Sequence, residues 1–369
     1  MRVKKIWFFY TISKLIYMFL ALFVYSKFTQ LGDTKRYISG VNYGSPNWWY
    51  SSTEMMDLLA HTFAKIVGPI LANVPFVFLA VYGVYYSVER SGFTYNQKIK
   101  VLLFLSLPSF SIWSSIASKE AMAVFFMGVI LGFFFEIINK VKVTNKLLVI
   151  LCIYLCVIFK PQYMIGLISI FTFVFFSRTA FKSANSKLFV FVMFLVVSFS
   201  VLYFLRDIIN DYSYIMPAHF SLEAGSTRVN DIWVNDYDVF RNAFYGMFIG
   251  FWGPTLSESI AKPIHFLVFI ESFIVVGTFL ILLVITCLKF IRYRIINIMF
   301  ISLVIISLSW ILCVHYPFGA LNPGSAIRYR TNFFSFLVVV IYFVYLKANS
   351  KLLNRGYFEK NTTHYYRPQ

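Results

Sequence analysis

Charged and phenolic side chains stand together directly after the first long apolar segment, at 32–37, which reads Gly-Asp-Thr-Lys-Arg-Tyr. Two more charged motifs occur where apolar segments end, at Lys119-Glu120 and at Lys160-Pro-Gln. A carboxylate can accept the proton of an attacking hydroxyl group, and lysine and arginine side chains bind phosphate oxygens. These residue types therefore predict acid–base chemistry on a phosphate-bearing substrate, if the three segments meet in space.

Asp33 and Glu120 are the candidate acid–base residues, and each also has a purely structural explanation. Either carboxylate could instead form an ion pair with a neighbouring cation, Lys35, Arg36 or Lys119, and the sequence leaves both explanations open. A divalent cation that bridges the two acids is a less favoured alternative, so neither a metal ion nor another cofactor is expected. The four cysteines all lie inside apolar segments, where packing is the expected role.

The composition shows that membrane helices must position these residues. Hydrophobic residues make up 59% of the 369-residue chain, charged residues make up 13%, and the mean hydropathy is +0.73. An average soluble domain has roughly 25% charged residues. We therefore expect an all-α, polytopic integral membrane protein with a single transmembrane domain over residues 1–347 and a polar tail at 348–369.

Ten apolar runs are candidates for transmembrane helices, since about 20 apolar residues cross the hydrocarbon core as a helix. The runs lie at 6–28, 63–88, 101–116, 120–139, 147–159, 161–176, 188–205, 267–288, 295–314 and 331–347. The run at 101–116 is short, so Lys119 and Glu120 should be recessed below the membrane surface. The runs at 147–159 and 161–176 are also short, and they should form a hairpin that carries Lys160 into the outer half of the membrane.

Two longer connections, 29–62 and 206–266, lie on the same side of the predicted membrane. In the first connection, Ser51 and Glu54 have the Ser-x-x-Glu spacing of a capping box. This box should start an amphipathic helix that lies on the membrane surface next to the spans, with Glu54, Asp57 and His61 on its water-facing side.

The net charge of +18 indicates membrane topology rather than nucleic-acid binding. Lysine and arginine gather in every second connection, which is the distribution described by the positive-inside rule. Both termini and the tail should accordingly lie in the cytoplasm, and the connections 29–62 and 206–266 should lie on the outer face.

Cations and polar groups on the outer face are candidates for binding the anionic substrate. Arg328 and Arg330 flank Tyr329 in the loop before the last span. Two arginines on the outer side run against the usual charge distribution, which favours a function over interfacial anchoring. The full candidate binding set is Lys35, Arg36, Tyr37, Lys119, Lys160, Gln162, Arg228, Arg241, Arg328, Tyr329 and Arg330.

Short motifs along the whole chain carry a family resemblance. The Gly-Asp-x-x-x-Tyr pattern at 32–37, the amphipathic surface helix, the Pro-Ser…Ser-Lys-Glu turn at 108–120 and the Lys-Pro-Gln turn at 160–162 resemble polytopic glycosyltransferases of the GT-C fold class. The Phe- and Tyr-rich spans, the long outer loop and the Arg-Tyr-Arg before the last span resemble bacterial O-antigen or capsular repeat-unit polymerases. Many GT-C enzymes end in a sizeable soluble domain, whereas only a short polar tail is expected here, and this difference favours the polymerase.

The resemblance implies an enzyme of the bacterial cytoplasmic (inner) membrane with its active site on the periplasmic or extracellular face. Such an enzyme polymerises undecaprenyl-diphosphate-linked oligosaccharide repeat units into O antigen or capsule. By the same resemblance, Asp33 and Glu120 are acid–base groups, and Arg228, Arg241, Arg328 or Arg330 hold the diphosphate. Implied partners are the lipid-linked oligosaccharide, membrane lipid, and flippase and chain-length regulator proteins, with no nucleic acid.

Three other functions remain open. A GT-C transferase that adds one sugar from a polyprenyl monophosphate would need the same residue types. A transporter or flippase of the lipid-linked glycan would call for charged groups near the bilayer midplane and internally repeated, broken helices, and no repeat is visible. An acyltransferase would need a catalytic histidine, for which His219, His265 and His315 are the outer candidates.

Overall fold

The computed structural model describes residues 2–139, 143–179, 183–219, 227–292 and 298–363. These residues form helices and connections, with no β-strand among them, which confirms the all-α expectation. The α-helices are α1 (Arg2–Phe23), α2 (Thr34–Ser39), α3 (Ser52–Val67), α4 (Val74–Arg90), α5 (Tyr95–Phe104), α6 (Pro108–Trp113), α7 (Lys119–Asn139), α8 (Lys146–Phe159), α9 (Pro161–Thr179), α10 (Ala184–Phe204), α11 (Arg206–His219), α12 (Asp238–Arg241), α13 (Ala243–Trp252), α14 (Leu256–Ala261), α15 (Pro263–Arg292), α16 (Ile298–Gly319) and α17 (Pro323–Thr363). Short 3-10 helices are η1 (Tyr25–Lys27), η2 (Pro46–Trp49) and η3 (Leu71–Asn73).

Seven helical segments within the described ranges are long and apolar enough to cross a membrane, which supports a multi-pass membrane protein. They are Lys4–Lys27, Leu71–Arg90, Lys119–Asn139, Ala184–Phe204, Ile264–Arg292, Ile298–Gly319 and Pro323–Ala348. The other three predicted spans are built from shorter helices, namely α5 with α6, then α8, then α9. The number of crossings beyond the seven stays a prediction.

The predicted span 101–116 is not one helix, because Pro108 interrupts it. Helix α5 ends at Phe104 and α6 begins at Pro108. The proline ring disfavours the helical conformation of the residue before it, and Leu107 accordingly has φ −57° and ψ 142°. The chain between Trp113 and α7 then turns, so that Lys119 and Glu120 form the first turn of a long, largely buried helix.

The predicted surface helix is α3, and Ser51 caps it by accepting a hydrogen bond from the Glu54 amide at 3.5 Å. The side expected to face water is covered instead by α2. Asp57 is fully buried and lies 3.5 Å from the Arg36 guanidinium of α2, and His61 bonds to the α2 backbone. Helices α2 and α3 therefore form one unit, which we call the α2–α3 cap.

The second span starts later than its predicted first residue at 63, because Gly68 ends α3. Its φ of +85° is a conformation that favours glycine, and the following Pro69 cannot continue the helix. The span is therefore Leu71–Arg90 rather than 63–88.

The last predicted outer loop, which was expected to run to Arg330, is shorter in the structure. Helix α16 continues to Gly319 and α17 starts at Pro323. The Asn322 side chain accepts a hydrogen bond from the Ser325 amide at 2.9 Å, and proline at the first helical position is a common helix start. Arg328 and Arg330 consequently lie inside α17, two residues apart and on opposite faces.

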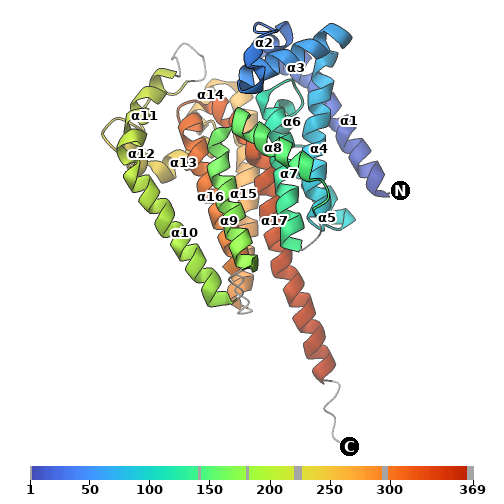
Figure 1. Cartoon of the computed structure of the whole chain (residues 1–369), viewed down its shortest axis with the longest axis vertical. Helices are drawn as coiled ribbons and strands as arrows, with labels where there is room; N and C mark the ends of the chain where they lie inside the picture. The colour runs from blue at the N-terminus through green and yellow to red at the C-terminus, as the bar shows by residue number, and fades with distance from the viewer. Residues whose placement is uncertain (1, 140–142, 180–182, 220–226, 293–297, 364–369) are drawn as a thin grey trace, which may run out of the picture.

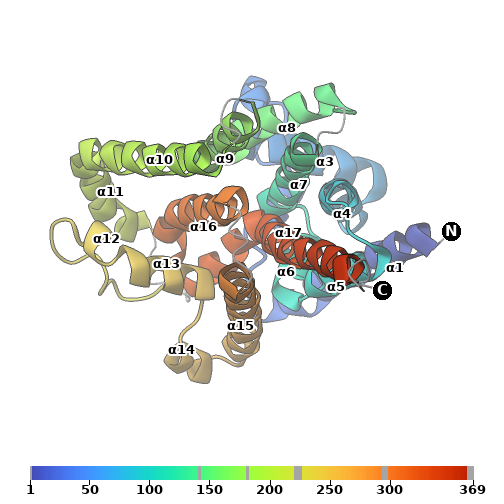
Figure 2. The ribbon, with the colours of Figure 1, turned by 90° about the horizontal axis from the view of Figure 1, so that it is seen from below.

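The helices are arranged around α7 and α17, which run side by side in the middle of the bundle (Figures 1 and 2). The α2–α3 cap lies at one end of the bundle (Figure 1). At the opposite end, α17 extends beyond the other helices. Helix α10 stands at the edge next to α9 (Figure 2). No residue in the most apolar stretch of α10 is buried, which suits a helix surrounded by lipid.

Two glycines allow α4 and α7 to pack closely. A Cβ atom on Gly128 would lie 2.2 Å from the Gly83 carbonyl oxygen, and one on Gly83 would lie 2.4 Å from the Val124 carbonyl oxygen. Membrane helices depend on such small residues because lipid supplies little hydrophobic drive for helix association.

We expect Gly128→Ala to lower the free energy of unfolding by about 1–3 kcal/mol, because the added methyl group overpacks the α4–α7 contact. Thermal unfolding of the purified protein in detergent measures this effect. Gly277→Ala is the matched control, since a Cβ atom there meets nothing within 4 Å and alanine favours the helix by about 1 kcal/mol. Equal losses in both variants would contradict the close-packing explanation.

Candidate functional site

Arg328 joins the two carboxylates that the sequence singles out. Its Nε donates to Glu120 at 3.0 Å, and its NH2 group donates to Asp33 at 3.2 Å. These three residues come from α17, from the first turn of α7 and from the connection before α2. Residues that lie 295 and 208 positions apart in the chain are thus brought into one charged cluster.

The two carboxylates have different surroundings. The Glu120 side chain is fully buried, and its Oε2 has no hydrogen-bond partner in the described part of the chain. The Asp33 side chain is 46% exposed. A solute can therefore reach Asp33 directly, whereas Glu120 is inaccessible and holds the Arg328 guanidinium group from the protein interior.

Tyr37 supports Asp33 from one helical turn away. Its hydroxyl group donates to Asp33 Oδ2 at 3.3 Å, which is the oxygen that also accepts from Arg328. Burial and the Asp33 charge raise the pKa of Tyr37, so the phenol stays protonated and acts as a donor. Asp33 Oδ1 accepts no hydrogen bond from any described residue and is free for a ligand.

Two lysines complete what we call the Arg328 cluster. Lys119 lies within electrostatic range of Asp33 and Glu120, and its ammonium group donates to Ser52 and Thr53 at the start of α3, at 2.9 and 2.7 Å. Lys160, between α8 and α9, is 7% exposed. Three cations against two carboxylates leave the cluster with one net positive charge, which suits an anionic ligand.

Tyr329 lies beside two of the three cations of the Arg328 cluster. The Lys160 ammonium is 4.5 Å from the centre of the Tyr329 ring, and the Arg328 guanidinium carbon is 5.5 Å from it. Trp113, which was not predicted, has its ring 5.7 Å from the Arg328 carbon. Aromatic faces stabilise cations at such distances, so these rings help to hold Arg328 in place.

Gly32 explains why glycine precedes Asp33. Its φ is +54°, and a Cβ atom there would lie 2.5 Å from an Arg328 nitrogen. A Cβ atom at position 32 would overlap the present position of the Arg328 guanidinium group, so a larger residue would have to displace it.

We expect Gly32→Ala to displace Arg328 and to lower the rate of any reaction at the Arg328 cluster at least about 10-fold, because misplacing a binding group by 1 Å can cost about 100-fold. The reconstituted assay described under the proposed function measures this rate. The matched control is Gly44→Ala. Gly44 also has a positive φ, +88°, but nothing lies within 4 Å of its added Cβ, so alanine there strains the backbone without the clash. Similar activity of the two variants would show that the strain, not the contact with Arg328, matters.

Two predicted arginines do not join the cluster. Arg330 points away from it and is buried against Glu271 at 3.6 Å, donating to Ser272 at 2.9 Å and Ser109 at 3.1 Å. Arg228 pairs with Glu258 at 2.6 Å and donates to the carbonyl groups of two connections. Both guanidinium groups are occupied by contacts within the protein, which indicates that Arg330 and Arg228 stabilise the packing of helices and connections.

The remaining predicted binding residues lie at the periphery or elsewhere. Arg36 pairs with Asp57 inside the α2–α3 cap. Lys35 lines a separate groove on the other side of α2. Arg241 is exposed on the short helix α12, and Gln162 follows Lys160 at the start of α9 without a hydrogen bond to any described residue.

Lys14 and Glu271 are charged residues inside apolar runs that are not among the predicted site residues. Lys14 is buried and donates to the Leu105 carbonyl at 3.0 Å and the Ser111 hydroxyl at 2.9 Å. Glu271 accepts from the Ser109 amide at 2.9 Å. A charged residue inside an apolar run was the available signal, and both residues tie the broken α5–α6 segment to its neighbours.

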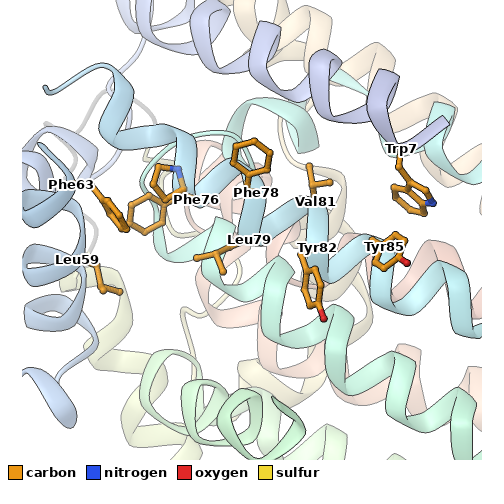
Figure 3. A pocket seen from close by; sticks show the side chains of 10 residues that line it. Trp7, Leu59, Phe63, Phe76, Phe78, Leu79, Val81, Tyr82 and Tyr85 are labelled. Carbon is orange, nitrogen blue, oxygen red and sulfur yellow. The ribbon is translucent and has the colours of Figure 1, made fainter. Parts of the chain in front are cut away.

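Two other features have no part in the Arg328 cluster. No group of three or more His, Cys, Asp or Glu side chains within the described ranges is arranged to hold a metal ion. A groove of about 630 Å³ runs along α4, with Leu59 and Phe63 at one end and Trp7 and Tyr85 at the other (Figure 3). Its lining is apolar or aromatic, so the groove suits binding of a hydrocarbon chain rather than catalysis of a reaction.

Comparison with known proteins does not assign the chain to a family. The chain matches no protein-family model, no curated protein and no solved structure. A function is therefore inferred from the Arg328 cluster itself.

Proposed function

We propose that the chain is a membrane glycosyltransferase that polymerises undecaprenyl-diphosphate-linked oligosaccharide repeat units into O antigen or capsule. The observation that carries the proposal is the bridge from Arg328 to a half-exposed carboxylate, Asp33, and a buried one, Glu120. A single cluster thereby holds a reachable base next to cations for a phosphate leaving group.

In this proposal, Arg328 and Lys160 bind the diphosphate of the donor. Transfer of the glycan breaks the bond between its first sugar and the diphosphate, which leaves with additional negative charge. Cations that are already held in place stabilise that charge without reorganisation. The net positive charge of the Arg328 cluster and the low exposure of Arg328, 17%, support this role, because electrostatic attraction is stronger where water is excluded.

Asp33 is the base of the proposed reaction. It takes the proton from a sugar hydroxyl of the acceptor unit as that hydroxyl attacks the donor sugar. Its free Oδ1 and its exposure support this role, and the Tyr37 and Arg328 hydrogen bonds hold its other oxygen. We assign Glu120 to positioning Arg328, because the Glu120 side chain is fully buried.

The proposed topology places the α2–α3 cap on the outer face of a bacterial cytoplasmic membrane, with both termini inside. The alternation of basic connections supports it. Lipid-linked oligosaccharide is the proposed substrate, and flippase and chain-length regulator proteins are the proposed partners.

Reconstitution tests the function directly. The purified protein in nanodiscs is given lipid-linked units extracted from a strain that lacks this gene, and the products are separated by length. We expect chains of several units together with released undecaprenyl diphosphate. Addition of one sugar from a polyprenyl-phosphate sugar would favour the single-sugar transferase. If the protein in liposomes moved the intact lipid-linked unit from one leaflet of the bilayer to the other, without forming a glycosidic bond, this result would favour the flippase.

A further inference from the structure

A second groove, of about 560 Å³, lies on the other side of α2 from the Arg328 cluster. Asp33 and Tyr37 are one turn apart and face the cluster, whereas Lys35, Ile38 and Ser39 line the groove. These two sets lie about half a turn apart around α2. Helix α2 therefore separates the Arg328 cluster on one side from this groove on the other.

The groove combines cations with an apolar wall. Its lining contains Lys35, His61 and Lys65 but no Asp or Glu. Both lysines are exposed, and Lys35 has no hydrogen-bond or ion-pair partner among the described residues. The Lys65 ammonium lies 4.0 Å from the centre of the Tyr43 ring. Two lysines without an ion-pair partner among the described residues thus line a groove that contains no acidic side chain.

His61 adds a polar atom to the groove. Its Nδ1 lies 2.9 Å from the Ile38 carbonyl oxygen, and because a carbonyl can only accept, Nδ1 carries the proton. Nε2 then has no partner in the described part of the chain. Gly40 permits this arrangement, since a Cβ atom there would lie 2.4 Å from the His61 ring.

The apolar wall comes from helix ends at the boundary of the candidate spans. Leu22 and Phe23 are the last residues of α1, and Ile70 directly precedes the span Leu71–Arg90. A ligand that fills this groove must present an anion to the lysines and hydrocarbon to these three side chains. The groove along α4 in Figure 3 lacks the first property, because no cation lines it.

We propose that the groove binds the headgroup of a membrane lipid that carries a phosphate monoester. The phosphate lies between Lys35 and Lys65, and the chains of the lipid lie against Phe23 and Ile70. This site is separate from the Arg328 cluster and does not depend on the reaction proposed for it. The charge of the lining selects the phosphate, and the position at the end of two spans selects a lipid over a soluble anion.

Phosphatidate, titrated into the full-length protein in phosphatidylcholine nanodiscs and counted by native mass spectrometry, tests the proposal. We expect Lys35→Ala and Lys65→Ala each to weaken binding about fivefold and the double variant about 25-fold, since a lysine near a lipid surface contributes about that factor. Both side chains are exposed, and a thermal unfolding scan checks that the variants are folded.

Lys27→Ala is the matched control, because Lys27 is an exposed lysine at the same end of α1 that does not line the groove. It should leave the affinity unchanged. An equal loss in Lys27→Ala would show diffuse attraction to the surface and overturn the site. Displacement of phosphatidate by millimolar inorganic phosphate would mean a soluble ligand, and equal binding of phosphatidylcholine would mean that no headgroup is selected, so either result overturns the proposal.

Discussion

Replacing Arg328 with alanine is expected to lower the rate of glycan chain extension by about 100- to 1000-fold. That is the usual effect of removing one preorganised donor to a charge that develops in the transition state. Arg328→Lys should not restore the rate, because one ammonium group cannot replace donors that reach Glu120 and Asp33 at the same time. Release of undecaprenyl diphosphate in the reconstituted assay measures the effect.

Stability has to be separated from activity in this experiment. Arg328→Ala leaves the fully buried Glu120 without its cation, and an uncompensated buried charge costs about 3–5 kcal/mol. The double variant Glu120→Gln/Arg328→Ala removes both charges, so it should regain most of the lost thermal stability while remaining inactive. Arg241→Ala, on the exposed helix α12, should keep normal activity. A double variant with restored activity would rule out a direct role for Arg328.

Asp33→Asn is expected to lower the turnover rate by about 100- to 10,000-fold, the range attributed to a positioned general base. Asparagine keeps the size of the side chain and can still accept from Tyr37, but it cannot take a proton. Because Asp33 is 46% exposed, its ion pair contributes little to stability, so the variant should fold normally. Turnover and KM are measured separately in the reconstituted assay.

The ion-pair explanation of Asp33 makes a different prediction. If Asp33 only holds Arg328, its loss should weaken substrate binding and raise KM, with turnover nearly unchanged. Asp207→Asn is the matched control, because Asp207 is also exposed, lies 3.5 Å from Arg206 and accepts from Tyr237 at 2.7 Å. Asp207→Asn should have normal kinetics. A raised KM alone in Asp33→Asn would assign Asp33 to positioning.

Local sequence signals predicted most of the helices. Ser51 and Glu54 marked the start of α3, and the apolar run at 120–139 became α7 almost unchanged. Two prolines explain the helix boundaries that were predicted at the wrong positions. Pro108 divides the span predicted at 101–116, and Pro323 starts α17 before the arginines that were expected in a loop. Both boundaries follow from proline chemistry that the apolar pattern alone does not register.

The separation of Arg328 from Arg330 required the tertiary structure. The two side chains stand in the same Arg-Tyr-Arg motif, yet a helix turns them to opposite faces, so one meets Asp33 and Glu120 and the other meets Glu271. Arg228 likewise has the residue type of a phosphate ligand but is used to brace two connections. Residue type therefore identified candidate cations without showing which ones have free donors.

By itself, the sequence determined that the chain is helical and apolar enough for a membrane, since these properties depend on composition and local periodicity. It also identified Asp33, Glu120 and Lys160 as unusual, because charged groups at the ends of apolar runs are costly. Only the tertiary structure decided that Arg328 joins the two acids, that Asp33 is reachable while Glu120 is buried, and that α2 separates the cluster from a second cationic groove. The physical reason is that these contacts link residues far apart in the chain, and their distances depend on how α2, α7 and α17 pack together.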